Sequence, residues 1–260
     1  MAPASSRRSE PGSIRINKFF TEQGICSRRD ADRLVEEGRV TVNGRRAVLG
    51  DVVAPCDRVE LDGRLIPWGS RRIYIRYHKP VGITTTSEPD VPGNIIAAIN
   101  HPERIFPVGR LDKDSSGLIL LTNDGDIVNE ILRVEHSHER EYVVRVDRPF
   151  DREFLERMAA GVLVLGRPTL PCRVRGETAD RFRIVLIEGR NRQIRRMCQA
   201  LGYRVITLQR VRIMHLTLDG LPVGRWRDLT ATERDELFRA VGRTAVSTEP
   251  NRPPGPLLSG

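Results

Sequence analysis

The apolar runs of this 260-residue chain are short, and turn residues bound them. The run "LILL" at residues 118–121 follows a glycine and precedes "TNDGD", so it predicts a buried strand that ends in a turn. No apolar run approaches the ~18 residues of a membrane-spanning helix. A chain of this length can bury a proper core in one large domain or in two smaller ones.

Residues 13–69 have the pattern of a small independent module. The stretches "IRINKFFTEQGI" and "SRRDADRLVEEG" have helical spacing, and in the second Ser27 is placed to cap the helix and Gly38 to end it. An Asn-Gly pair at 43–44 and an Asp-Gly pair at 62–63 then give strong hairpin signals. Two helices followed by short strand pairs predict a compact α+β module.

Strand-like and helical stretches are mixed from residue 71 to residue 243. "RIYIRYHKPVGITTT", "REYVVRV", "RFRIVLI" and "YRVITLQRVRIMHLTL" have strand composition, whereas "DREFLERMAAGV", "NRQIRRMCQALG" and "TATERDELFRAV" have helical spacing. We therefore predict one α+β domain around a central, largely antiparallel sheet. Residues 1–12 and 244–260 lack an apolar core and are predicted to be a disordered leader and tail.

The charge of the chain favours a polyanionic partner. Its 43 basic and 34 acidic side chains give a net charge of +9, and only Lys18, Lys79 and Lys113 are lysine. Arginine binds phosphate bidentately and stacks on bases, so the bias suits nucleic acid, although a GC-rich genome alone would also produce it.

The histidines and cysteines do not predict a metal site or a disulfide framework. The four cysteines are far apart without CxxC spacing, and His136 and His138 have no third ligand at a suitable spacing. We expect reduced thiols in a cytoplasmic protein with no metal and no membrane association.

Two arginines near the start of the second helix stand where a cation is disfavoured. Arg28 and Arg29 fall in the first turn, where a positive charge opposes the helix dipole by roughly 0.3–1 kcal/mol. An RNA phosphate backbone would compensate for this cost, and a merely solvated face is the alternative interpretation.

The segment "GRLDKDSSGLILL" places an acid where a scaffold can aim it. Asp112 lies among basic residues at the mouth of the predicted strand. Basic density then peaks between Glu188 and Arg212, with seven arginines against one acid. Of these, Arg195 borders the packed face of its helix, and a partly buried guanidinium needs a carboxylate partner. Tyr142, in "EYVV", fits either strand packing or stacking on a nucleobase.

The motifs "KPVGI", "GRLDKDSSGLILLTNDGD", "EYVV" and "EGRNRQIRRM", in this order, resemble those of the RsuA/RluF family of pseudouridine synthases. Before them, residues 13 to about 62 resemble the S4 RNA-binding domain. The details "GICSRRDADR" and "RIMHLTLDGLPVGRW" are most similar to the branch of the family that acts on large-subunit (23S) ribosomal RNA.

The resemblance implies an RNA isomerase that needs no cofactor. It implies that Asp112 is the catalytic aspartate, Tyr142 the tyrosine that packs on the target base, and Arg195 the arginine paired with the aspartate. Arg110 matches the arginine that helps to hold the RNA helix open. The expected RNA contacts are Arg28, Arg29, Arg33, Lys79, Arg110, Arg190, Arg192 and Arg196.

Several alternatives remain open from the sequence. A ribosome-assembly factor without enzymatic activity would use the same basic surfaces, and an RNA glycosidase would differ only in releasing the base. We expect a monomer that acts on ribosomal RNA, either free or in an assembly intermediate, with transfer RNA as an open second substrate. The sequence does not decide between attack of Asp112 at C1′ and removal of a proton from C2′.

Overall fold

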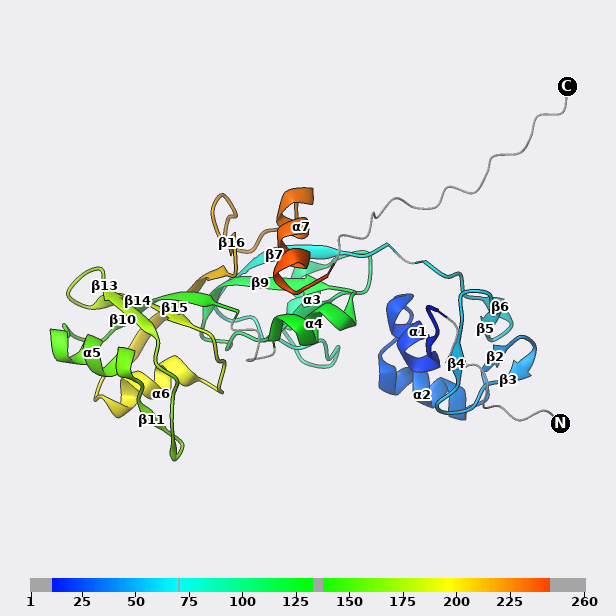
Figure 1. The fold of residues 1–260 in the computed structure, drawn as a ribbon, viewed down its shortest axis with the longest axis horizontal. Helices are drawn as coiled ribbons and strands as arrows, with labels where there is room; N and C mark the ends of the chain where they lie inside the picture. The colour runs from blue at the N-terminus through cyan, green and yellow to red at the C-terminus, as the bar shows by residue number, and fades with distance from the viewer. Residues whose placement is uncertain (1–10, 70, 133–137, 244–260) are drawn as a thin grey trace, which may run out of the picture. The chain divides into compact units, whose positions relative to one another are not determined.

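The computed structural model describes residues 11–69, 71–132 and 138–243. The chain divides into two compact units, and each is described by itself (Figure 1). The first reaches from the N-terminus to Arg72 and includes residues 123–125, and the second covers residues 73–122 and those from 126 to 245. The predicted leader and tail lie outside the described residues, except for residues 11 and 12. No helix in the described ranges combines the length and apolarity needed to cross a membrane.

The first unit has two helices beside short antiparallel strands. Helices α1 (Ile16–Glu22) and α2 (Arg28–Glu36) end close to the glycines that the sequence indicated. The Ser27 side chain caps α2 by accepting a hydrogen bond of 3.1 Å from the backbone N–H of Asp30. A four-stranded sheet has the order β3-β2-β5-β6, and β1 pairs with β4. The strands are β1 (Ile14–Arg15), β2 (Val40–Val42), β3 (Arg45–Arg46), β4 (Val52–Val53), β5 (Val59–Leu61) and β6 (Arg64–Leu65).

Both predicted hairpin turns of the first unit form. Asn43 and Asp62 adopt positive φ angles of 52° and 50°, and the glycine after each does so too. Asn, Asp and Gly tolerate this left-handed conformation, which gives a two-residue turn the twist of its strands. The core beneath is built from apolar side chains of the helices and strands, including Phe19, Phe20 and Val35.

The second unit is organised by a nine-stranded sheet. The main path has the order β13-β14-β10-β15-β9-β7-β17, with β16 paired to β15 and β8 paired to β9. All pairs are antiparallel except β15 with β9, so the predicted mixed, largely antiparallel sheet is confirmed. The strands are β7 (Tyr74–Lys79), β8 (Phe106–Val108), β9 (Ser116–Thr122), β10 (Arg140–Val146), β13 (Arg173–Gly176), β14 (Arg181–Leu186), β15 (Val205–Ile213), β16 (Leu216–Thr217) and β17 (Trp226–Asp228).

Helices cover this sheet, and three of them were predicted. These are α5 (Arg152–Ala160), α6 (Gln193–Ala200) and α7 (Ala231–Ala240); α3 (Ile95–Ile99) and α4 (Gly125–Leu132) were not. A two-stranded hairpin of β11 (Leu163–Val164) and β12 (Arg167–Pro168) lies between α5 and β13. Side chains of α5 and α6 pack with β10, β14 and β15 in one apolar core, and α4 and α7 contribute to another.

The parallel contact between β9 and β15 fixes where the loop before β9 lies. Gly117 pairs with Arg210, has a φ of +118°, and leaves no room for a Cβ, which would clash with the Arg210 backbone. Only glycine allows this approach of two backbones. Because β9 follows directly on residues 109–115, the segment around Asp112 is held beside β15.

Candidate active site

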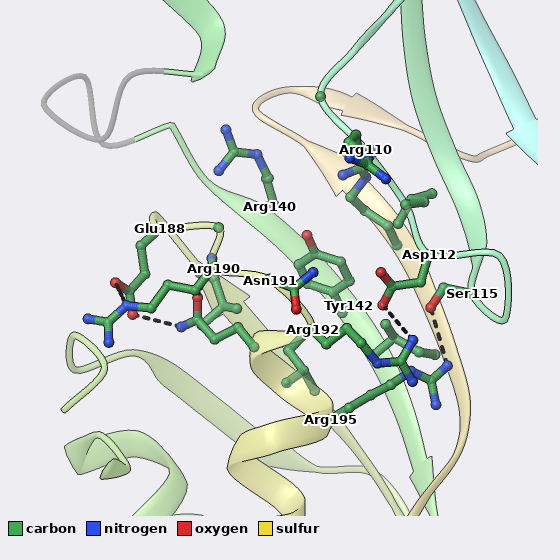
Figure 2. A pocket seen from close by; sticks show the side chains of 18 of the residues that line it. Arg110, Asp112, Ser115, Arg140, Tyr142, Glu188, Arg190, Asn191, Arg192 and Arg195 are labelled. Atoms are coloured by element: carbon green, nitrogen blue, oxygen red, sulfur yellow. Dashed lines mark hydrogen bonds and ion pairs between the residues drawn. The ribbon is translucent and has the colours of Figure 1, made fainter. Parts of the chain in front are cut away.

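A cavity of about 450 Å³ opens beside the loop that carries Asp112. Its walls come from this loop, from strands β10 and β15, and from the segment that leads into α6. Figure 2 shows the Asp112 carboxylate, the Tyr142 ring and the Arg192 guanidinium directed toward the same space. Segments distant in sequence therefore bring one acid, one tyrosine and several arginines together.

Local hydrogen bonds hold the backbone around Asp112. The N–H of Ser115 donates to the carbonyl of Asp112 at 3.1 Å, which closes a turn. The buried Thr85 hydroxyl donates to the carbonyl of Leu111 at 2.8 Å and accepts from its N–H at 3.3 Å. The side chain of Asp112 is 30% exposed, so a fixed backbone presents a carboxylate that a substrate can reach.

Arg192, and not Arg195, is the arginine that pairs with Asp112. Its Nη1 lies 3.5 Å from an Asp112 carboxylate oxygen, whereas the guanidinium of Arg195 makes its ion pair with Asp114. The expected pair of Arg195 with Asp112 is thus wrong. Arg192 has a φ of +51° just before α6 begins, a left-handed conformation that costs a non-glycine residue of order 1–3 kcal/mol.

Arg195 supports the loop that carries the aspartate. Its Nη2 donates to the carbonyl of Asp114 at 2.9 Å and to the hydroxyl of Ser115 at 3.2 Å, and its Nη1 donates to the carbonyl of Val205 at 3.3 Å. Its side chain is 13% exposed, which agrees with the predicted position beside the packed face of α6. Arg195 therefore links the loop to β15.

Asp114 forms ion pairs with both Arg192 and Arg195. Arg192 donates to both of its carboxylate oxygens, at 3.2 and 3.0 Å. Burial opposes ionisation, but the Arg192 hydrogen bond and the charges of Arg195 and Arg192 outweigh it, so the pKa of Asp114 lies below its usual value. Because Asp114 occupies the fork of Arg192, the Asp112 carboxylate lies beside a cation without being locked in a bidentate pair.

Tyr142 lies on β10 with one side toward the cavity and another toward the core. It packs against two apolar clusters, one of which contains Leu111. A half-buried ring held in this way can present a flat apolar surface to a base. The ring therefore packs in the sheet as one interpretation expected, and its contact with a base stays a prediction.

Two buried arginines that we did not predict complete the cavity. Arg140 is 8% exposed and donates to the carbonyl of Ile131 at 3.2 Å, and burial lowers its pKa. Arg210 is 3% exposed and donates through Nε to the carbonyl of Leu118 at 2.7 Å, while its buried Nη2 has no partner within the described structure. An unsatisfied buried donor beside a cavity is suited to a carbonyl or phosphate oxygen of a ligand. Arg140 lies two residues before Tyr142 on β10, and Arg210 lies two residues after Leu208 on β15. This alternation, which places each pair on one face of the sheet, was the sequence signal that could have revealed both arginines.

The predicted RNA contacts of the second unit differ in accessibility. Arg110 is exposed at the cavity, and Arg196 donates to the side chain of Asn191 at 3.0 Å. Arg190 is engaged by the protein, because it donates to Glu188 and to the carbonyls of Arg167 and Pro168.

Lys79 is fully buried, in contrast to the RNA contact expected for it. Its ammonium donates to the carbonyls of Pro80 and Ile83, both at 2.9 Å, and burial lowers its pKa to about 8. A buried ammonium that is satisfied by backbone carbonyls does not suit a contact with a phosphate on the protein surface.

The predicted RNA contacts of the first unit lie on α2. Arg28 and Arg29 are exposed and, among the described residues, take part in no ion pair. Arg33 is paired with Asp30 at 3.1 Å and lies 3.9 Å from Glu37, so its charge is partly balanced by its own helix. Arg28 and Arg29 remain the better placed of the three for a phosphate.

No metal cluster is found in the part of the chain that the structure describes: no three His, Cys, Asp or Glu side chains there are grouped to hold an ion. His136 lies outside the described residues. The cavity instead holds arginines around one accessible carboxylate, a set of side chains that suits an anionic substrate.

A mixed sheet with an aspartate, a tyrosine and arginines around one cavity, preceded by an α+β module with exposed arginines, agrees with the architecture expected of a pseudouridine synthase. The chain belongs to the RNA pseudouridylate synthase family, whose model matches residues 73–200, and the S4 domain model matches residues 14–59. The resemblance to the RsuA/RluF family and the S4 domain is thereby confirmed. The chain is an RNA pseudouridine synthase, and the enzymatic interpretation is favoured over a factor that only binds RNA.

Relatives of known designation cover nearly all of the chain. It is 48% identical to the dual-specificity RNA pseudouridine synthase RluF of Escherichia coli (strain K12), over 95% of this chain and 86% of that protein. It is 34% identical to the ribosomal large subunit pseudouridine synthase B of Bacillus subtilis (strain 168), over 86% of this chain and 95% of that protein. The crystal structure of a pseudouridylate synthase, 30% identical, covers 86% of this chain with a TM-score of 0.64.

Proposed function

We propose that this enzyme converts a specific uridine of large-subunit (23S) ribosomal RNA to pseudouridine, with Asp112 as the catalytic carboxylate. The observation that carries the chemistry is the accessible Asp112 side chain, held 3.5 Å from Arg192 at the wall of the cavity. The designation of the Bacillus relative as a large-subunit enzyme supports the choice of RNA.

The reaction conserves atoms and electrons. The N1–C1′ bond of uridine breaks, the uracil turns, and a C5–C1′ bond forms. C5 then loses its proton to solvent and N1 takes up a proton, so the composition of the nucleoside is unchanged. Cleavage develops positive charge at C1′, which a carboxylate can stabilise or capture. In one route Asp112 attacks C1′, and in the other it takes a proton from C2′. Both routes require an ionised and accessible carboxylate, and neither requires an oxidant or a reductant.

The other side chains of the cavity then have separate tasks. We assign to Tyr142 the packing against the uracil, and to Arg192 the positive charge beside Asp112. Arg195 is a positioning residue, because it bonds to the loop and not to the carboxylate. Arg110, exposed at the rim, is available to the strand that the target leaves. The target must leave its stack to reach Asp112, at a cost of a few kcal/mol that contacts with the RNA must offset.

We assign to the first unit, which contains the S4 domain, a contribution to RNA binding that is separate from catalysis. We assign RNA binding to α2 through Arg28 and Arg29, which are exposed and stand where the helix dipole disfavours them. We expect a monomeric cytoplasmic enzyme that acts on ribosomal RNA, either free or in an assembly intermediate. The Escherichia relative is designated dual-specificity, so a second RNA substrate should be tested, and transfer RNA is the one that the sequence left open.

Mapping of pseudouridines tests the proposed substrate. Ribosomal RNA from a strain that lacks this enzyme should lose a specific pseudouridine of the large-subunit RNA, and the wild-type gene should restore it. A strain that carries Asp112→Asn should not regain it. An unchanged map of the large-subunit RNA would contradict the proposed substrate, and the same map of transfer RNA tests the second one.

A further inference from the structure

The turn of the β11–β12 hairpin differs in its residues from the two tight turns of the first unit. Its two-residue turn is Leu165-Gly166, with φ angles of 53° and 74°. The corresponding positions of the first unit are occupied by Asn43-Gly44 and Asp62-Gly63. Asn and Asp tolerate the left-handed conformation, whereas a bulky apolar residue such as leucine is strained in it. Met214 has the same φ in the β15–β16 turn, but it packs against an apolar core, whereas Leu165 belongs to none of the apolar clusters of the described residues. Packing within the fold therefore does not explain the leucine at this turn.

The same leucine is also placed unfavourably toward solvent. Leu165 is 76% exposed and Leu163, on the preceding strand, is 66% exposed; they are the two most exposed large apolar side chains of the described structure. The hairpin projects beyond α6 (Figure 1). A residue that is both strained and exposed contributes little to folding, so a contact with another molecule is the simplest reason for its presence.

The surroundings of the hairpin indicate which kind of molecule it contacts. A second cavity, of about 460 Å³, lies between Leu163–Leu165 and α6. The α6 side of this cavity includes Arg192, Arg195 and Arg196, and the first two of these arginines also line the active-site cavity. The second cavity thus has an apolar tip on one side and arginines on the other, and it shares two lining residues with the active-site cavity. Such a surface suits the bases and phosphates of one RNA strand.

Hydrogen bonds fix the hairpin to the segment that carries Arg192. The guanidinium of Arg190 donates to the carbonyls of Arg167 and Pro168, at 3.2 and 2.7 Å. The buried carboxylate of Glu188 accepts from the N–H of Leu170 at 2.9 Å and from the side chain of Gln193 at 2.7 Å. The position of the leucine tip relative to the active site is thus built into the second unit.

We propose that Leu165 packs against a base of the substrate RNA that lies outside the active-site cavity, next to the target uridine. This inference rests on the proposed function, because it requires RNA in the active site. Apolar side chains can stabilise bases that have left their stack, so the contact would favour the RNA conformation in which the target uridine is extracted. Arg196, on the opposite wall of the second cavity, is placed to bind the backbone of the same strand.

Substitution by asparagine separates this role from a structural one. Asparagine suits the left-handed turn, so Leu165→Asn should keep or raise the melting temperature of the protein. We expect it to lower kcat/KM for tritium release from C5-tritiated large-subunit ribosomal RNA by about tenfold, because the apolar contact is lost. Leu165→Met, apolar and of similar volume, should keep most of the activity. The matched control is Val223→Asn, since Val223 is 61% exposed and lines neither cavity.

Two results would overturn the inference. One is that Leu165→Asn and the wild-type enzyme have equal kcat/KM values with purified RNA. The hairpin would then contact a protein, or nothing, and not the substrate RNA. The other is a loss of activity accompanied by a lower melting temperature, which would make Leu165 structural. If large-subunit ribosomal RNA is not the substrate, the wild-type enzyme itself will release no tritium from it. This result differs from a failure of the inference about Leu165, in which only the variant is compared with an active wild-type enzyme.

Discussion

The Arg192 guanidinium lies 3.5 Å from the Asp112 carboxylate while it donates two hydrogen bonds to Asp114. Arg192 thus binds Asp114 through both carboxylate oxygens and also lies beside Asp112, whose side chain remains 30% exposed. Arg192→Ala should therefore reduce tritium release by roughly 10²-fold, because the charge beside Asp112 is lost. Because Arg192 is 41% exposed and ion pairs at the surface contribute little to stability, the melting temperature should change little. Turnover close to that of the wild-type enzyme would contradict the assigned role of Arg192.

Arg195→Ala should impair both stability and activity. The change removes the donors to the Asp114 carbonyl and to the fully buried Ser115 hydroxyl, so we expect a loss of about 1–3 kcal/mol in the free energy of unfolding. Activity should fall because the loop that presents Asp112 loosens. Arg204→Ala is the control, because Arg204 is exposed and forms no ion pair among the described residues. Chemical denaturation and tritium release measure the two effects, and equal small effects from both variants would reduce Arg195 to a solvated cation.

The sequence predicted which residues line the cavity better than it predicted which arginine pairs with Asp112. The stretch "NRQIRRMCQALG" was predicted to be helical from Asn191 on, but the helix begins only at Gln193 and Arg192 has a left-handed backbone. A periodicity of 3.6 residues does not apply across such a boundary, so the contact of Arg192 with Asp112 was not predictable from spacing. Arg140 and Arg210 were missed because their cavity forms only when β10 and β15 pair.

Local signals were reliable wherever the chemistry of a turn or cap decides the structure. The turns after Val42 and Leu61 and the cap at Ser27 formed as predicted, because each depends on a few adjacent residues. The turns at Leu165-Gly166 and Met214-His215 have no such signal, and the sequence revealed neither hairpin. Lys79 was expected on the surface, but nothing local to it indicates that it is buried in the folded sheet.

Stability at acid pH should depend on Glu233. Two hydrogen bonds of 2.7 Å from Arg227 lower the pKa of this carboxyl to about 2, against opposition from burial, and the N–H of Thr230 and the charge of Arg76 add to the effect. A carboxyl with a lowered pKa contributes stability that is full above its unfolded-state value of 4.5 and is lost as the pH falls toward 2. Glu233→Gln should lower the free energy of unfolding at pH 7 and weaken its decline between pH 5 and pH 3. Urea titrations across this range measure both effects, and parallel curves for the two proteins would count against this ion pair.

Lys79 should titrate near neutral pH. Burial lowers its pKa from 10.5 to about 8, although Asp112 and Asp114 act in the opposite direction. The folded state thus disfavours the charged form, so this residue costs stability below pH 8 and the cost is relieved as the pH rises toward 10.5. A carbon-13 NMR titration of the Lys79 side chain should show a midpoint near 8, and Lys18, on the first unit, serves as a partly exposed comparison. A midpoint above 10 would contradict this environment.

The arginines of α2 should contribute affinity without contributing to chemistry. Replacement of both Arg28 and Arg29 by Ala should weaken RNA binding and reduce its salt dependence by about one to two released counterions. Turnover at saturating RNA should change little, because both residues lie in the first unit and the active-site cavity in the second. Arg152→Ala is the control, as an arginine with a 91% exposed side chain near the start of α5. Parallel plots of affinity against salt for the wild-type and the doubly substituted protein would mean that α2 is only a solvated face.

The central claim is that Asp112 performs the isomerisation, and tritium release from C5-tritiated RNA tests it most directly. The wild-type enzyme should release tritium to water with no added metal ion or nucleotide, because the reaction replaces a C5–H bond by a C5–C1′ bond. Asp112→Asn preserves the size of the side chain and removes its charge, so this variant should still bind RNA and should lose at least about 10²–10⁴-fold in turnover. An Asp112→Asn protein that binds RNA and retains a substantial fraction of the wild-type rate would contradict the account.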